Sequence, residues 1–127
     1  MAPRSVSSLE IWRAAISLVE DAYRSTRGWP REEVYGLTSQ VRRAAISVPT
    51  NIAEGAGRGS PGEFARFIQI AVGSMYELDT LFEIAGRLGY AKTEGVRRLR
   101  AHLATLIRRT ASFARYQEFR RASIGRP

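Results

Sequence analysis

The sequence contains no cysteine and only one histidine, His102. A chain without cysteine cannot form a disulfide, a thiolate nucleophile, an iron–sulfur cluster or a cysteine-ligated zinc site. A single histidine also excludes the di-iron helical site, which requires Glu-x-x-His pairs on two helices. We therefore expect a domain that holds no metal and no cofactor.

Long apolar runs are also absent, and none approaches the roughly 20 residues that a membrane-spanning helix needs. The first residues, Met1 to Ser5, are not followed by the apolar stretch of a secretory signal. This pattern predicts a cytoplasmic protein with no membrane partner. The chain has 127 residues, of which 44% are hydrophobic, and we expect one domain spanning residues 1–127.

Charge is distributed unevenly along the chain, whose net charge is +8. Residues 1–90 contain ten arginines and ten acids, so this part is neutral. Residues 91–127 contain Lys92 and nine arginines but only two acids, Glu94 and Glu118. All of the excess positive charge therefore lies in the last quarter of the chain.

Apolar residues recur at three- and four-residue steps in four segments, a spacing typical of amphipathic helices. The first segment has Ser7 or Ser8 as its expected N-cap and ends before Pro30. The second runs from about Tyr35 to Glu54, and Pro49 predicts a kink near Ala45 or a break there. The apolar stripes predicted for these two helices are Leu9, Trp12, Ile16, Val19 and Tyr23, and Leu37, Val41, Ala44, Val48 and Ile52.

The third segment has the clearest start in the chain, since Ser60, Pro61 and Glu63 occupy the N-cap, N1 and N3 positions of a capped helix. It should end at Gly86 or Gly89, and the fourth segment begins at Thr93. Their predicted apolar stripes are Phe64, Phe67, Ala71, Met75, Leu78, Phe82 and Ala85, and Val96, Leu99, Leu103, Leu106, Thr110 and Phe113. The glycines from Gly55 to Gly59 predict a loop rather than a phosphate-binding turn, because no Gly-Lys-Ser or Gly-Lys-Thr follows them.

Four such helices joined by short loops predict an all-α, antiparallel, up-down-up-down four-helix bundle. The ordered core should cover about residues 8–118, and the basic C-terminal end should fray from Ala122.

A polar stripe accompanies the apolar stripe of the second helix. It consists of Gln40, Arg43, Ser47, Asn51 and Glu54, and could meet Ser74 and Glu77 of the third helix. Buried polar groups must be paired, so a structural network within the bundle or between subunits is the favoured interpretation. A ligand pocket and a metal held by Glu54 and Glu77 are weaker alternatives.

Arginines dominate the fourth segment and fall outside its apolar stripe. They are Arg97, Arg98, Arg100, Arg108, Arg109 and Arg115, and Arg120 and Arg121 extend the set. Arginine suits bidentate phosphate contact and stacking on bases, and Tyr116 and Phe119 offer aromatic surfaces nearby. Non-specific nucleic-acid binding is the leading hypothesis. The alternatives are a solvated face, pairing with acids such as Glu20, Asp21 and Asp79 within or between subunits, and docking of an acidic protein.

Three stretches carry a family resemblance: EVYGLTSQVRRAA at Glu33 to Ala45, SVPTNIAEGAGR at Ser47 to Arg58, and FARFIQIAVGSMYEL at Phe64 to Leu78. They resemble the ribosomal-RNA intervening-sequence protein family. The resemblance implies a four-helix bundle that assembles as a ring-shaped homopentamer. A related branch comprises the accessory variability proteins of diversity-generating retroelements, and likeness to it implies reverse transcriptase and RNA or DNA as partners.

The resemblance implies no enzyme, and the residues agree, because the sequence has neither a nucleophile elbow nor a distinctive carboxylate pair. For self-assembly, Trp29, Val34 and Tyr35 are the expected exposed apolar edge. Our expectation is a non-catalytic homo-oligomer that binds nucleic acid through its fourth helix. The alternative is an assembly or adaptor module for an acidic protein.

Overall fold

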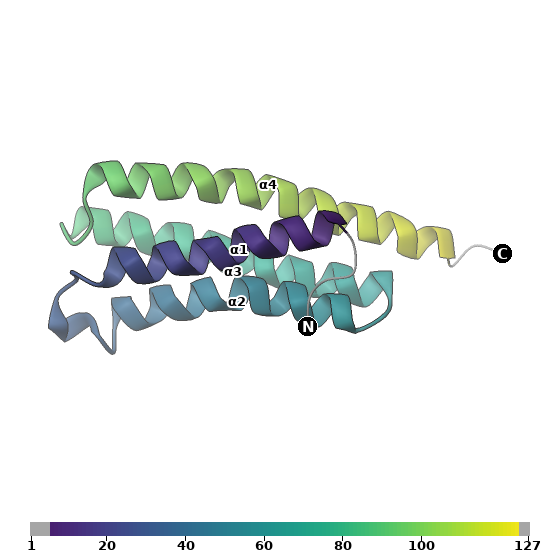
Figure 1. Ribbon diagram of the computed structural model, residues 1–127, viewed down its shortest axis with the longest axis horizontal. Helices are drawn as coiled ribbons and strands as arrows, with labels where there is room; N and C mark the ends of the chain where they lie inside the picture. The colour runs from purple at the N-terminus through teal and green to yellow at the C-terminus, as the bar shows by residue number, and fades with distance from the viewer. Residues whose placement is uncertain (1–5, 125–127) are drawn as a thin grey trace.

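The computed structural model describes residues 6–124 of the chain. It contains four α-helices, α1 (Val6–Thr26), α2 (Leu37–Gly57), α3 (Pro61–Arg87) and α4 (Thr93–Ile124), and a short 3₁₀ turn, η1 (Arg31–Glu33). Each helix runs in the opposite direction to the one before it (Figure 1). Contacts link α1 to α2, α2 to α3, α3 to α4 and α4 back to α1, with the α1–α4 contact the least extensive. The predicted all-α bundle is confirmed.

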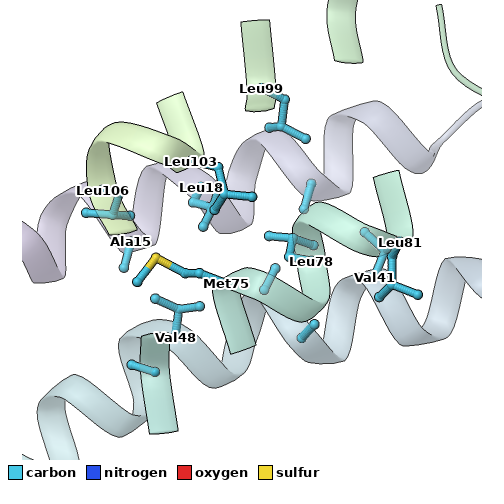
Figure 2. Packing of buried hydrophobic residues seen from close by; sticks show 14 of the residues in the cluster. Ala15, Leu18, Val41, Val48, Met75, Leu78, Leu81, Leu99, Leu103 and Leu106 are labelled. Carbon is cyan, nitrogen blue, oxygen red and sulfur yellow. The ribbon is translucent and has the colours of Figure 1, made fainter. Parts of the chain in front are cut away.

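The core is formed by apolar side chains from all four helices, most of them aliphatic, and Figure 2 shows Leu18, Val48, Met75 and Leu103 converging at its centre. The apolar stripes predicted for α2 and α4 are buried, except that Val96 at the start of α4 is half-buried. The α3 stripe is also buried, with Phe64 only partly covered. The apolar periodicity of these three helices therefore identified the faces that form the core.

The stripe predicted for α1 was wrong by one residue. The buried residues of this helix are Ser8, Ile11, Ala15, Leu18, Ala22 and Thr26, whereas Ile16 of the predicted stripe is 39% exposed. Small residues such as Ala15 and Ala22 let α1 approach its neighbours closely, which larger side chains would prevent. The larger apolar residues are thus left on an outer, partly exposed stripe. Helix α1 begins at Val6, so Ser7 and Ser8 lie inside its first turn rather than before it.

Helix α2 continues through Pro49 without the break that the proline allowed. Proline removes the amide that would bond the carbonyl of Ala45. Around it, side chains bond neighbouring carbonyls: Thr50 Oγ1 donates to Ile46 O at 2.7 Å, and Asn51 Nδ2 donates to Ser47 O at 2.8 Å. The helix also extends through Gly55 to Gly57, so the predicted loop is confined to the residues just after Gly57.

Both ends of α3 follow local rules. Ser60 Oγ accepts a hydrogen bond from the amide of Glu63 at 3.2 Å, as the capping pattern predicted. At the other end, Gly89 has a positive φ of 79°, and the amide of Tyr90 bonds the carbonyl of Ala85 at 2.9 Å. This left-handed glycine turns the chain sharply into α4.

Trp29 is a core residue, so its predicted place on an exposed apolar edge was wrong. Only 8% of it is exposed, and its ring lies 5.9 Å from that of Phe82 and 6.2 Å from that of Tyr90. Tyr90 donates a hydrogen bond to Glu33 at 3.0 Å, and this bond, aided by desolvation, raises the pKa of Tyr90. The aromatic cluster therefore closes this end of the bundle, whereas Val34 and Tyr35 of the predicted edge are exposed.

Helix α4 is the longest element and continues to Ile124, beyond the point where fraying was expected. Its last turns extend past the ends of the other helices (Figure 1), and the residues from Phe119 to Ile124 are exposed. None of the described helices has both the length and the hydropathy needed to cross a bilayer.

Candidate nucleic-acid interface

The outward side of α4 carries four exposed arginines, Arg97, Arg98, Arg108 and Arg115, which we call the outer face. Arg97, Arg108 and Arg115 share one line of the helix surface and span roughly 27 Å along the axis, given 1.5 Å per residue. Arg97 lies 3.8 Å from Glu94 in an exposed pair, while Arg98 and Arg115 form no ion pair within residues 6–124. The outer face is thus a row of largely uncompensated positive charge.

Arg100, another of the predicted nucleic-acid contacts, lies apart from this face and is directed toward α3. Its guanidinium bonds both carboxylate oxygens of Asp79, at 2.7 and 3.2 Å, and also bonds Glu83. Bonds from Arg87 and Arg100 lower the pKa of Glu83, and the bond to Asp79 raises the pKa of Arg100. Pairing with an acid such as Asp79 was one of the alternatives to nucleic-acid binding. Arg100 forms this pair, and its ion pairs connect α4 to α3.

The other three candidate arginines lie in the second half of α4, and each has one partner within the protein. Arg109 forms an exposed pair with Glu10 of α1 at 3.5 Å. Arg120 donates to the carboxamide oxygen of Gln117 at 3.2 Å, and Arg121 pairs with Glu118 at 3.4 Å. These contacts are single and mostly exposed, so a phosphate could replace or join them.

The predicted polar network exists only at its centre. Ser47 and Ser74 join α2 to α3 through a hydroxyl–hydroxyl hydrogen bond of 2.8 Å, and Asn51 donates to Ser47 Oγ at 2.9 Å. Glu54 instead pairs with Arg58 at the surface, at 2.9 Å. The side chains of Gln40, Arg43 and Glu77 are exposed and make no hydrogen bond to other described residues. The part of the stripe that is joined across helices is therefore a small bridge between α2 and α3.

Sequence reasoning missed a groove at the end of the bundle where α4 extends past α1. Its volume is about 970 Å³, and we call it the end groove. It lies between α4, the first turns of α1, the end of α2 and the start of α3, and its charged and aromatic lining consists of Glu10, Phe64, Arg108, Arg109, Phe113, Tyr116 and Arg120. The only hint in the sequence was the spacing of Phe113, Tyr116 and Arg120 on one side of the basic segment.

The aromatic residues of the end groove contact one another. The Phe64 and Phe113 rings meet edge to face with centroids 5.1 Å apart, and the Tyr116 ring lies 6.4 Å from that of Phe113. Tyr116 is 56% exposed, whereas Phe119, the other aromatic residue suggested for stacking, is 69% exposed and lies outside the groove lining. The structure thus separates these two candidates for stacking.

Among residues 6–124, no three histidine, aspartate or glutamate side chains lie close enough together to hold a metal ion. Fold and surface together define a small helical-bundle protein whose charge is concentrated on one helix. A family model described as "23S rRNA-intervening sequence protein" matches residues 7–112. The chain belongs to the 23S rRNA-intervening sequence protein family. No curated protein matches the chain significantly.

Proposed function

We propose that this protein is a non-catalytic homo-oligomer that binds RNA or DNA without sequence preference through the outer face of α4. The observation that carries the proposal is the row of exposed, largely unpaired arginines formed by Arg97, Arg108 and Arg115, with Arg98 beside it. Phosphates accept bidentate bonds from guanidinium groups, and contacts to the backbone carry no sequence information.

The charge distribution supports the same partner. Helix α4 carries eight arginines and two glutamates, whereas residues 1–90 are neutral overall. A polyanion that binds α4 displaces its own counterions, and this release makes affinity fall steeply as salt rises. A homopentamer would carry a charge of about +40, which strengthens the attraction to any phosphate polymer.

The outer stripe of α1 supports self-association. Ile16 is exposed, and Trp12, Val19 and Tyr23 beside it are only half-buried. Apolar side chains in a continuous stripe on a helix surface favour a partner that covers them. In a ring, this stripe would contact a different surface of the next copy, and assembly about a closed symmetry axis repeats that contact.

The test is the salt dependence of binding to a labelled single-stranded RNA and to a DNA duplex. The variant is R97Q/R98Q/R115Q, which removes three of the four outer-face arginines and keeps Arg108, because Arg108 also lines the end groove. Loss of three phosphate contacts should reduce the slope of log K against log salt by about two to three units and weaken binding at least about tenfold. Folding should be unaffected, because all three side chains are exposed.

A matched control is R24Q/R66Q/R87Q, which removes the same charge from α1 and α3. These arginines are exposed and each pairs with an acid on its own helix. The control should retain most of the wild-type affinity. An equal loss of affinity in both variants would show that binding depends on the net charge of the protein and not on the outer face. Wild-type protein that bound neither polymer at 100 mM salt would refute the proposal. In that case an acidic protein partner becomes the leading candidate.

A further inference from the structure

The proposed function places backbone contacts on the outer face and leaves the end groove unexplained. We infer that the end groove binds one unpaired nucleotide of the nucleic acid, with its phosphate on the groove arginines and its base against Tyr116. This inference rests on the proposed function and adds a preference for single-stranded over fully paired nucleic acid.

The size and charge of the end groove suit a nucleotide. Its volume of about 970 Å³ lies at the upper end of the roughly 300–1,000 Å³ typical of small-molecule sites. Three arginines and one glutamate line it, so its charged side chains sum to +2. Arg109 and Arg120 each have one local partner at 3.2 to 3.5 Å, which leaves further N–H donors of each guanidinium available for phosphate oxygens.

The aromatic lining distinguishes a nucleotide from a simple anion. An inorganic phosphate needs only the arginines, whereas Phe64, Phe113 and Tyr116 present ring surfaces in the same groove. A planar base stacks on such a surface, and the contact is worth about 1–3 kcal/mol per base by alanine substitution. Tyr116 is the ring that a base can reach, since it is more than half exposed while Phe113 is buried.

A buried amide adds a polar group beside these rings. Gln117 lines the end groove, is 2% exposed, and accepts the hydrogen bond from Arg120 through its side-chain oxygen. Binding of a phosphate by Arg120 would therefore bring the nucleotide close to this carboxamide. Amide groups can bond the edges of unpaired bases.

Base pairing determines which nucleic acid can use this site. Within a duplex, both faces of every internal base are covered by its neighbours, so an aromatic side chain at the surface cannot stack on it. An unpaired base can turn into the end groove while the backbone continues along α4. The outer face should thus serve both forms of nucleic acid, and the end groove only single strands.

The experiment compares two groove variants, Tyr116→Ala and Arg120→Gln, with Phe119→Ala as control. Phe119 is an exposed aromatic residue on the same helix, three residues beyond Tyr116 and outside the groove lining. The probes are a labelled 12-nucleotide single-stranded RNA, a blunt duplex of the same sequence, the mononucleotides AMP and UMP, and polyglutamate.

We expect Tyr116→Ala to weaken binding of the single strand about tenfold and to leave duplex affinity unchanged, with Phe119→Ala close to wild type. Arg120→Gln should also weaken the single strand, and both groove variants should lose chemical-shift changes that AMP and UMP cause in wild-type protein. Unchanged single-strand affinity in Tyr116→Ala, or equal loss with Phe119→Ala, overturns the inference. If wild-type protein binds polyglutamate and Tyr116→Ala weakens that binding as well, the inference is overturned, and the groove is a site for an acidic peptide.

The outcomes separate the two proposals. If R97Q/R98Q/R115Q loses affinity for both the single strand and the duplex while Tyr116→Ala keeps its affinity for both, the proposed function stands and the end-groove inference falls. If mononucleotides bind in the groove while the outer-face variant keeps its full affinity and salt slope, the proposed function falls alone.

Discussion

Two glycines near the end of α2 give a direct test of how the end groove is built. A Cβ atom added at Gly55 would lie 2.8 Å from Cβ of Phe67 and 3.0 Å from the Phe64 ring, whereas nothing lies within 4 Å of a Cβ added at Gly57. Both glycines are helical and have negative φ, so alanine fits the backbone at each position. Only packing between α2 and α3 distinguishes them.

The expected stability changes have opposite signs. Replacing a helical glycine by alanine gains up to about 1 kcal/mol, and less at the last turn, so Gly57→Ala should stabilise the fold by about 0.5 kcal/mol. At Gly55 the obstructing atom is close to the backbone of Phe67 and cannot rotate away. Overpacking of this kind costs about 1–3 kcal/mol, which leaves Gly55→Ala less stable by about 1–2 kcal/mol.

Urea unfolding of wild type and both variants, monitored by circular dichroism at one fixed protein concentration, measures the difference. A gap of about 2 kcal/mol between the variants at similar m-values would support the close approach of α2 and α3 at Gly55. Two variants of equal stability would contradict it, and with it the position of Phe64 in the end groove.

Two further predictions concern the α3–α4 contact and self-association. Arg100→Gln should lower stability at neutral pH by no more than about 1 kcal/mol, because the ion pairs are partly exposed. Since bonds from Arg87 and Arg100 lower the pKa of Glu83, this stabilisation is present above the ordinary glutamate pKa and is lost as pH falls through the lowered one. Thermal unfolding at pH 7 and pH 3 should therefore show the gap between variant and wild type shrinking in acid, and a constant gap would contradict the ion-pair account. By light scattering, wild type should have a mass several times 14.2 kDa at micromolar concentration and Ile16→Glu a smaller one, while a monomeric wild type would exclude the proposed homo-oligomer.

The fold could be predicted from sequence wherever one helix face was clearly the most apolar. In α2, α3 and α4 a single stripe outweighed every other, and the cap at Ser60 fixed the start of α3. Helix α1 has two apolar stripes instead. The stripe that contains Ala15 and Ala22 is buried, and the stripe with the larger side chains lies outside the core, because close helix packing depends on shape as well as hydrophobicity.

The site was only partly predictable, for reasons of distance along the chain. Heptad positions correctly placed Arg97, Arg98, Arg108 and Arg115 outside the core. They could not show that Arg100 would lie level with Asp79 and Glu83, because this depends on how far α3 and α4 are offset along the bundle. The end groove depends on four segments that meet only in the folded chain.

The α1–α4 contact also has a consequence for how the protein folds. It joins the first and last helices, so its formation must close the longest loop in the chain, and it is the least extensive of the four helix contacts. Long-range contacts of this kind carry the largest entropic cost of closure and slow folding. Helices α2 and α3 are connected by a short turn and share the most extensive contact, so this hairpin should form first. Helix α1 should dock against α4 last. Nascent chains that lack α4 would then leave the core face of α1 without one of its two partners.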